Sequence, residues 1–217
     1  GVQTCALPIS TGRRTDLRPV LTEQNSSGQD GFFSARITGT LAGLHTVSAT
    51  SDKVVSYAPA RSIKSCKVYF LVSSSPDKVM PGAGASKPLG HAFEIVPMTD
   101  PCTALGKGVP MVVQVMYQGK PIANQRVSFI PNGAELSAGF DPQFERMTDE
   151  QGMAKFEPAI ANCVLIVAHR EESGQAGEGF NMTKYSATMT VLVPEQKVKL
   201  DASAGECADG CCGSGAE

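Results

Sequence analysis

Hydrophobic and polar residues alternate with a period of two along much of the chain, which is typical of β-strands with one buried face. The pattern begins near Phe32 and is clear in RSIKSCKVYFLVS, where one face carries Cys66, Val68, Phe70 and Val72. We therefore expect several short β-segments between residues 32 and 73.

The alternation returns, more regularly, after a stretch rich in Ser, Pro and Gly at residues 73–90. Successive strands are predicted at HAFEIVPM, VPMVVQVMYQG, NQRVSFIP, GMAKF, ANCVLIVAHRE and TKYSATMTVLV. The residues expected on their inward faces are Met111, Val113, Val115 and Tyr117, then Val127, Phe129, Ala154 and Phe156, and finally Ala187, Met189, Val191 and Val193.

Turn residues separate these strands. Gly119-Lys120-Pro121 predicts one turn, and TDEQG predicts another in which Asp149 bonds its own backbone and Gly152 supplies a positive φ. No segment shows an apolar period of 3.6 over three turns. Short strands with turn signals about every ten residues predict a β-sandwich.

The predicted fold class is all-β, with two immunoglobulin-like or transthyretin-like β-sandwich units, the first incomplete. We divide the chain into an adapter-like peptide, a weakly ordered lead-in, a partial N-terminal sandwich, a linker, a C-terminal sandwich and a flexible cysteine-containing tail, at residues 1–10, 11–31, 32–73, 74–91, 92–194 and 195–217.

The first nine residues, GVQTCALPI, have neither the period of a strand nor the pattern of a signal peptide. Back-translated, they look like a widely used short-read sequencing adapter. We therefore expect residues 1–10 to make no core contacts, and the natural N-terminus, with any export signal, to lie upstream.

Composition narrows the classes of function. The formal net charge is −2, which argues against a nucleic-acid partner, because such proteins normally present a basic surface. The sequence contains no run of eighteen apolar residues, so it predicts no transmembrane helix. We find no GxSxG elbow, no HExxH and no Gly-rich phosphate loop, and we expect no enzyme.

Three stretches carry a family likeness: GHAFEIVPMTDP, then VQVMYQGKPIANQRVSF, then MTDEQGMAKFEPAIANCVLIVAHRE with YSATMTVLV. Together they resemble the exported bacterial domain-of-unknown-function family labelled nickel-uptake substrate-specific, or periplasmic component of cobalt transport. GKP with TDxxG also resembles carboxypeptidase-regulatory-like sandwich modules. The resemblance implies export to the periplasm or cell surface and a link to nickel or cobalt uptake.

Histidines and cysteines are the candidate metal ligands. Imidazole suits nickel, cobalt, copper and zinc, so His91 and His169, each at the end of a predicted strand, are candidates, although an exposed or hydrogen-bonded structural role is the alternative. His45 lies in mid-strand and is interpreted as structural. In the tail, GECADGCCGSGAE brings Cys207, Cys211 and Cys212 within six residues, where thiolates can wrap a soft ion.

Other roles for the cysteines stay open. The tail is also consistent with an internal disulfide, an anchoring or cross-linking thiol, or a disordered terminus with no role. Cys102 and Cys163 lie at strand edges of one predicted sandwich, where a disulfide is possible if their Cα atoms are within about 7 Å; the alternative is that both fill the core.

Two functional hypotheses follow. The first is an exported, non-catalytic β-sandwich binding protein, whose partner is a metal ion or a membrane transporter or receptor. The second is a structural or adhesive spacer module of a cell-surface assembly. Stoichiometric retention of a metal ion by the purified protein would favour the first hypothesis.

Overall fold

The fold is known from a computed structural model, which describes residues 4–8, 14–25, 31–37, 41–55, 59–75, 79 and 84–200. Nearly all of its regular structure is β-strand, so the predicted all-β class is confirmed. In this part of the chain, no helix has the length and apolar character needed to cross a membrane.

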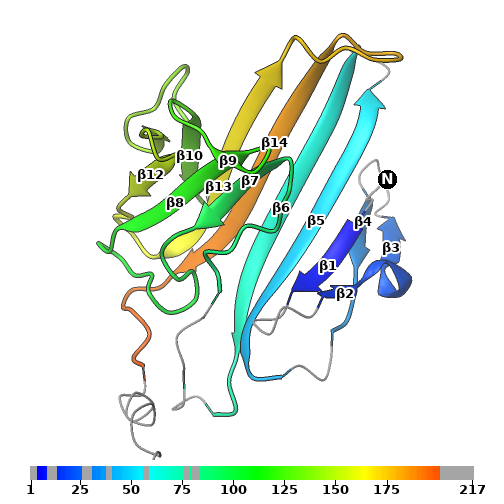
Figure 1. Ribbon diagram of the computed structural model, residues 1–217. Helices are drawn as coiled ribbons and strands as arrows, with labels where there is room; N and C mark the ends of the chain where they lie inside the picture. Colours follow the sequence, from blue (N-terminus) through cyan, green and yellow to red (C-terminus); the bar gives the residue numbers. More distant parts are fainter. Residues whose placement is uncertain are drawn as a thin grey trace, which may run out of the picture.

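The largest layer is an eight-stranded sheet that runs the length of the molecule (Figure 1). Its strands, in spatial order, are β11 (Glu145–Met147), β10 (Arg126–Pro131), β13 (Asn162–Glu172), β14 (Met182–Val193), β6 (Ala60–Val72), β5 (Gly43–Val55), β1 (Thr4–Pro8) and β2 (Arg14–Asp16). The pairing of β14 with β6 is parallel, and all the others are antiparallel.

A smaller sheet covers one face of this layer at β13, β14 and β6 (Figure 1). It contains β12 (Met153–Phe156), β8 (Met111–Tyr117) and β7 (Phe93–Pro97), with the short β9 (Lys120–Pro121) paired to β8. The remaining elements belong to the lead-in: the 3-10 turn η1 (Arg18–Val20) and the hairpin of β3 (Thr22–Asn25) and β4 (Gly31–Ser34).

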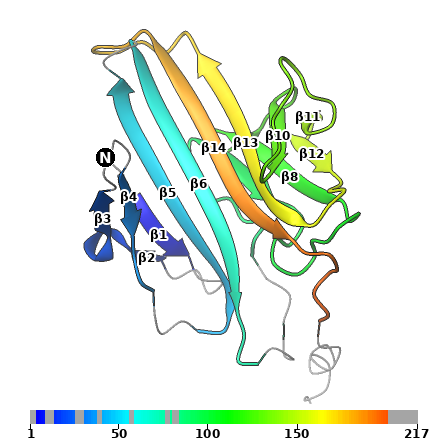
Figure 2. The same ribbon diagram turned by 180° about the vertical axis from the view of Figure 1, so that it is seen from behind.

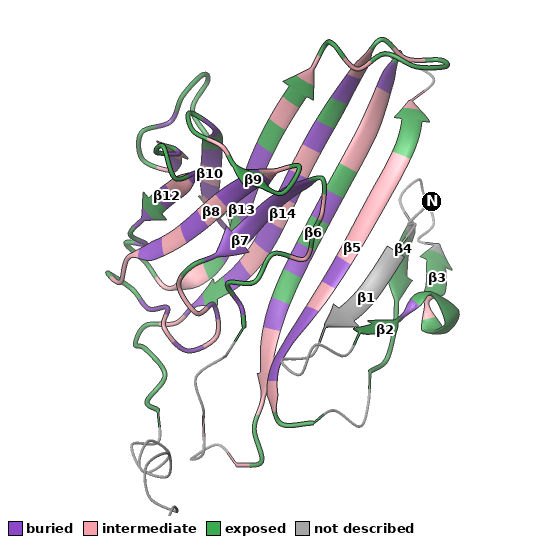
Figure 3. Cartoon of the chain, viewed as in Figure 1, coloured by how far each residue is buried: buried purple, intermediate pink, exposed green. Residues whose placement is uncertain are grey.

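The main core lies between the two sheets and has the composition that the alternation predicts. Buried residues alternate with partly or fully exposed ones along β14 (Figure 3). The inward residues predicted for β8, β10, β12 and β14 are buried, except that Tyr117 is only partly so. Figure 2 shows no second sheet over the opposite face of β13, β14 and β6. On this side Leu17 and Leu21 form a small cluster with Val47 and Ala49 of β5 and Phe70 of β6.

The alternation along β6 is as predicted, but the core lies on the other face of the strand. Ser65, Lys67 and Tyr69 are buried, whereas Cys66 and Val68 are exposed. An alternating pattern separates two faces but does not say which one a second sheet will cover. Here the smaller sheet covers the more polar face.

The two predicted sandwich units share one sheet. Ala60–Val68 of β6 pairs in register with Met182–Thr190 of β14, so the long strands of the first expected unit extend the sheet of the second. The adapter-like peptide also contributes a strand, β1, which pairs with Ser48–Thr50 of β5. Strand pairing uses main-chain groups, so it does not require a selected sequence. Contacts of the β1 side chains, to which the expectation of no core contacts refers, lie outside what the structure describes.

Candidate functional site

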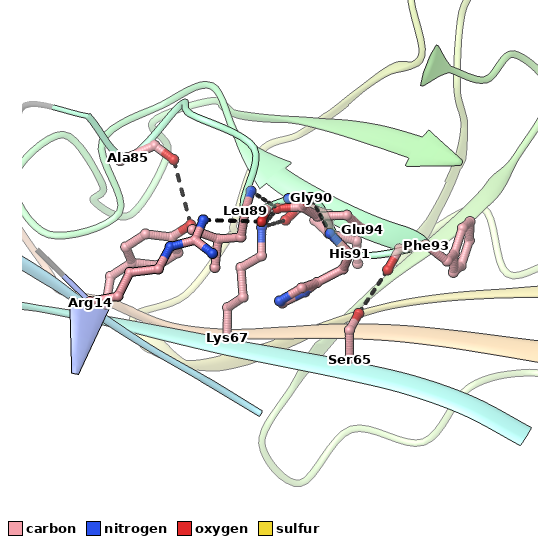
Figure 4. Close-up of polar contacts among 11 residues, drawn as sticks. Arg14, Ser65, Lys67, Ala85, Leu89, Gly90, His91, Phe93 and Glu94 are labelled. Carbon is pink, nitrogen blue, oxygen red and sulfur yellow. Dashed lines mark hydrogen bonds and ion pairs between the residues drawn. The ribbon is translucent and has the colours of Figure 1, made fainter. Parts of the chain in front are cut away.

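The strongest concentration of buried polar groups lies where β6 passes the free edge of β7. On its other edge β7 pairs with β8. On the β6 side, Ser65 Oγ donates to the carbonyl of Phe93 at 2.8 Å (Figure 4). Lys67 Nζ donates to the carbonyl of Ile95 at 2.9 Å. Two side chains of β6 thus satisfy edge carbonyls of β7 and join the two sheets.

Glu94 of β7 lies at the centre of this site and is 1% exposed. Its carboxylate forms an ion pair with Lys67. It also accepts hydrogen bonds from three successive backbone amides, those of Leu89 at 2.6 Å, Gly90 at 3.0 Å and His91 at 3.1 Å. These amides belong to residues 84–91, which we call the strap.

The strap can direct three amides at one carboxylate because Gly90 has a φ of +87°. Consecutive amides converge into an anion-binding concavity when a left-handed residue follows an extended or right-handed one. No atom lies within 4 Å of the place where a Cβ of Gly90 would be, so a side chain would not clash there. Glycine is favoured at this position because of its positive φ.

Electrostatics keep Glu94 ionised. Burial alone would raise its pKa, but the Lys67 ammonium and the Leu89 amide, with a smaller contribution from His91, outweigh burial and hold the pKa below its usual value. Burial lowers the pKa of Lys67, and the charge of Glu94 opposes that shift. Next to the pair, burial and the Glu94 charge raise the pKa of Tyr69, whose hydroxyl donates to the Ala85 carbonyl at 3.5 Å.

His91 follows the strap glycine directly. Its imidazole extends towards β6 beside Lys67 (Figure 4), and Nδ1 is buried with no hydrogen-bond partner among the described residues. Burial lowers the pKa of His91, the charges of Lys67 and Arg14 lower it further, and Glu94 opposes them. The ring is therefore neutral at pH 7. Arg14, from β2, reaches the Leu89 carbonyl at 3.4 Å.

The second candidate ligand, His169, is on the opposite face of the large sheet. It is exposed on β13 and lies, across β14, on the sheet face that carries Lys64 of β6. Lys67 of β6 is on the other face, where it binds Glu94 beside His91 (Figure 4). Burial and the charges of Arg126 and Lys64 lower the pKa of His169. The structure therefore does not bring the two candidate histidines together.

His45 has the surroundings expected of a structural histidine. It is fully buried, its Nε2 lies 2.8 Å from the Leu41 carbonyl oxygen, and its ring stacks on Phe70 with a centroid distance of 5.1 Å. Its Nδ1, like that of His91, is buried with no hydrogen-bond partner among the described residues.

The described cysteine side chains are those of three free thiols, and the side chain of Cys5 and the three tail cysteines lie outside what the structure describes. Cys66, Cys102 and Cys163 are free, so Cys102 and Cys163 do not form the disulfide considered from the sequence. Cys163 is exposed on β13, whereas Cys102 packs partly buried against the main core. Cys207, Cys211 and Cys212 lie outside the described residues. Within the described part of the chain, no group of three or more His, Cys, Asp or Glu side chains is placed to hold a metal ion.

Sequence reasoning missed the two central residues, Lys67 and Glu94. A signal existed for Glu94, which is the one charged residue in FEIVP, a strand that is otherwise apolar. Lys67 gave no such signal, because it alternates with Cys66 and Val68 as a solvent-facing lysine would.

Comparison with known proteins identifies the family but not an activity. No curated protein matches the chain. Among solved structures, the D0-D1 domain of Intimin is similar at 17% identity over 88% of this chain and 82% of that one, with a TM-score of 0.24, which is too low to support an argument. The sequence model described as "Domain of unknown function (DUF4198)" matches residues 9–172. The chain therefore belongs to this family of unknown function.

Proposed function

We propose that the chain is a non-catalytic β-sandwich module that works in the periplasm or at the cell surface and binds a transition-metal ion as an accessory to nickel or cobalt uptake. The observation that carries this proposal is the imidazole of His91, which is neutral and has a buried, unpartnered Nδ1 in the described structure. A neutral imidazole keeps the lone pair that nickel, cobalt, copper and zinc require.

A non-catalytic role is proposed because the charged pair beside His91 is committed to structural contacts. The Glu94 carboxylate is bound by Lys67 and three amides, and Lys67 also binds the Ile95 carbonyl. A general acid or base must reach the proton of a substrate, and these groups are 4% exposed or less.

A metal ion needs more ligands than one imidazole. Because Nδ1 of His91 is buried, binding there requires the strap to move and to contribute ligands or admit water. The tail thiols of Cys207, Cys211 and Cys212 are the alternative place for a soft ion such as Cu(I). A membrane transporter or receptor is the partner to which such a module would deliver its ion.

The test is metal titration of the full chain by calorimetry with Ni²⁺, Co²⁺, Cu²⁺ and Zn²⁺. We expect His91→Ala to weaken the tightest site at least tenfold and His169→Ala, the matched control on the opposite face, to leave it unchanged. Loss of binding only in the triple Cys→Ser variant of the tail would move the site to the tail. Absence of stoichiometric binding in the unchanged chain would overturn the metal proposal.

The second candidate is a structural or adhesive spacer. The feature that favours it is the single sheet that joins both halves, with the second sheet fixed to it through Ser65, Lys67 and Glu94. A rigid body of this kind transmits force without an internal hinge. This role predicts that no metal is retained and that the gene lies beside genes for surface-anchored proteins.

A further inference from the structure

The strap surrounds the Glu94 carboxylate in the way that a receptor surrounds a bound anion. Three amides and one ammonium converge on the two carboxylate oxygens, and nine-tenths or more of both charged side chains is buried. Charge-assisted hydrogen bonds of this kind are the strong ones in proteins. The site therefore has all the groups that a carboxylate ligand needs.

Contacts that do not involve Glu94 also hold the strap in place. A turn within the strap is closed by the amide of Lys87, which donates to the Gly84 carbonyl at 3.2 Å, and the Tyr69 hydroxyl of β6 donates to the Ala85 carbonyl at 3.5 Å. Arg14 binds the Leu89 carbonyl from outside, and Ser65 fixes β7 at Phe93. The concavity is thus organised by its surroundings as well as by the anion in it.

We propose that the Leu89–His91 amides and Lys67 form a carboxylate-binding site that the chain fills with its own Glu94, and that the site takes a small free carboxylate when this side chain is removed. The ligand class is a monocarboxylate. A phosphate dianion would bring a second charge into a site that offers a single buried cation. This inference does not rest on the proposed metal function, and its test is made with EDTA present.

The part of the Glu94 side chain that a substitution removes determines which free carboxylate should fit the site. Glu94→Ala removes a carboxymethyl group, which is equivalent to acetate, whereas Glu94→Gly removes the equivalent of propionate. We expect acetate to stabilise the alanine variant best and propionate the glycine variant best. Glu94→Gln should respond to neither anion, because its side chain still fills the space.

The measurement is the thermal midpoint at pH 7 in about 0.2 M sodium acetate or propionate, compared with sodium chloride at the same ionic strength. A ligand that binds only the folded state raises the midpoint, here on the order of 5 °C for Glu94→Ala in acetate if acetate binds at millimolar concentration. Glu145→Ala is the matched control, because Glu145 is also buried at 3% exposure but accepts from one backbone amide, that of Asp141, and from Ser128 Oγ. Its cationic partner, Arg126, is half exposed and lies 3.7 Å away, whereas Lys67 is buried against Glu94.

The carboxylate site can also be tested if Glu94→Ala does not fold in chloride. In that case the folded fraction is followed by near-ultraviolet circular dichroism as acetate is added. Recovery with acetate and not with chloride or phosphate supports the site. Equal behaviour in acetate and chloride, or an equal response of Glu145→Ala, overturns it.

Discussion

Lys67 has a place that lysine rarely takes in a soluble protein, with only 4% of its surface exposed. Its ammonium binds both the Glu94 carboxylate and the Ile95 carbonyl, so one side chain connects β6 to β7 twice. A buried charge of this kind stabilises the fold only while its partners are present.

Truncation of the Lys67 side chain should therefore lower the free energy of unfolding strongly. Lys67→Ala leaves the Glu94 carboxylate buried without a counter-ion, and we expect a loss of about 3–5 kcal/mol in the free energy of unfolding, measured by urea denaturation. Lys64→Ala is the control, because Lys64 lies on the same strand but on the exposed face, and it should change stability by less than about 0.5 kcal/mol. Equal losses in the two variants would contradict the role assigned to the ion pair.

The same site should make stability depend on pH. The pKa values of His91 and Glu94 are both lowered in the folded chain, so the unfolded chain binds protons more readily at each. Their stabilising contributions are present above the unfolded pKa values, about 6.5 for His and 4.3 for Glu, and are lost as the pH falls below them.

We expect the thermal midpoint to fall as the pH drops from 7 to 5, and to fall less steeply in His91→Gln, which keeps the strap amide but has no titratable ring. An identical slope in the variant and the unchanged chain would show that His91 does not contribute.

At the scale of elements, the sequence predicted most of the C-terminal strands, because their apolar faces alternate without interruption. Val113 and Val115 of β8 and Val127 and Phe129 of β10 are buried as expected. The site was not predictable in the same way. Lys67 and Glu94 are 27 residues apart, and their pairing depends on which face of β6 the smaller sheet covers, which a period of two cannot specify.

The turn before β12 was predicted in detail, and the structure confirms it. Asp149 Oδ1 accepts hydrogen bonds from the amides of Gln151 at 2.9 Å and Met153 at 2.8 Å, and Gly152 has a φ of +73°. A Cβ on Gly152 would lie 2.9 Å from the Val115 carbonyl oxygen, so this glycine also allows a close approach to β8.

Gly152→Ala should consequently lower the free energy of unfolding by at least about 2 kcal/mol, from backbone strain together with the clash. Gly174→Ala is the control, because no atom lies within 4 Å of its Cβ position and its φ is not positive. Chemical denaturation of both variants makes the comparison. A Gly152 variant as stable as the Gly174 variant would mean that the turn adjusts without cost.

At the scale of the whole molecule, the shared sheet joins regions that the sequence divides into two units. β14 has β13 on one side and β6 on the other, so neither half completes its hydrogen bonding alone. We expect a single cooperative transition in differential scanning calorimetry, with equal calorimetric and van't Hoff enthalpies. Two separate transitions would indicate that residues 32–73 and 92–194 unfold as independent units.

The parallel pairing of β6 and β14 also bears on how the chain reaches this structure. Thr188 Oγ1 bonds the carbonyl of Ser65, 123 positions earlier in the chain. Contacts between such distant residues form slowly, because a long loop must close before they can be made. During synthesis β6 emerges before its partner strand, β14, has been made. A chain made only as far as β13 therefore carries an open hydrogen-bonding edge on β6, and the parallel pairing at the centre of the large sheet forms only after β14 has been made.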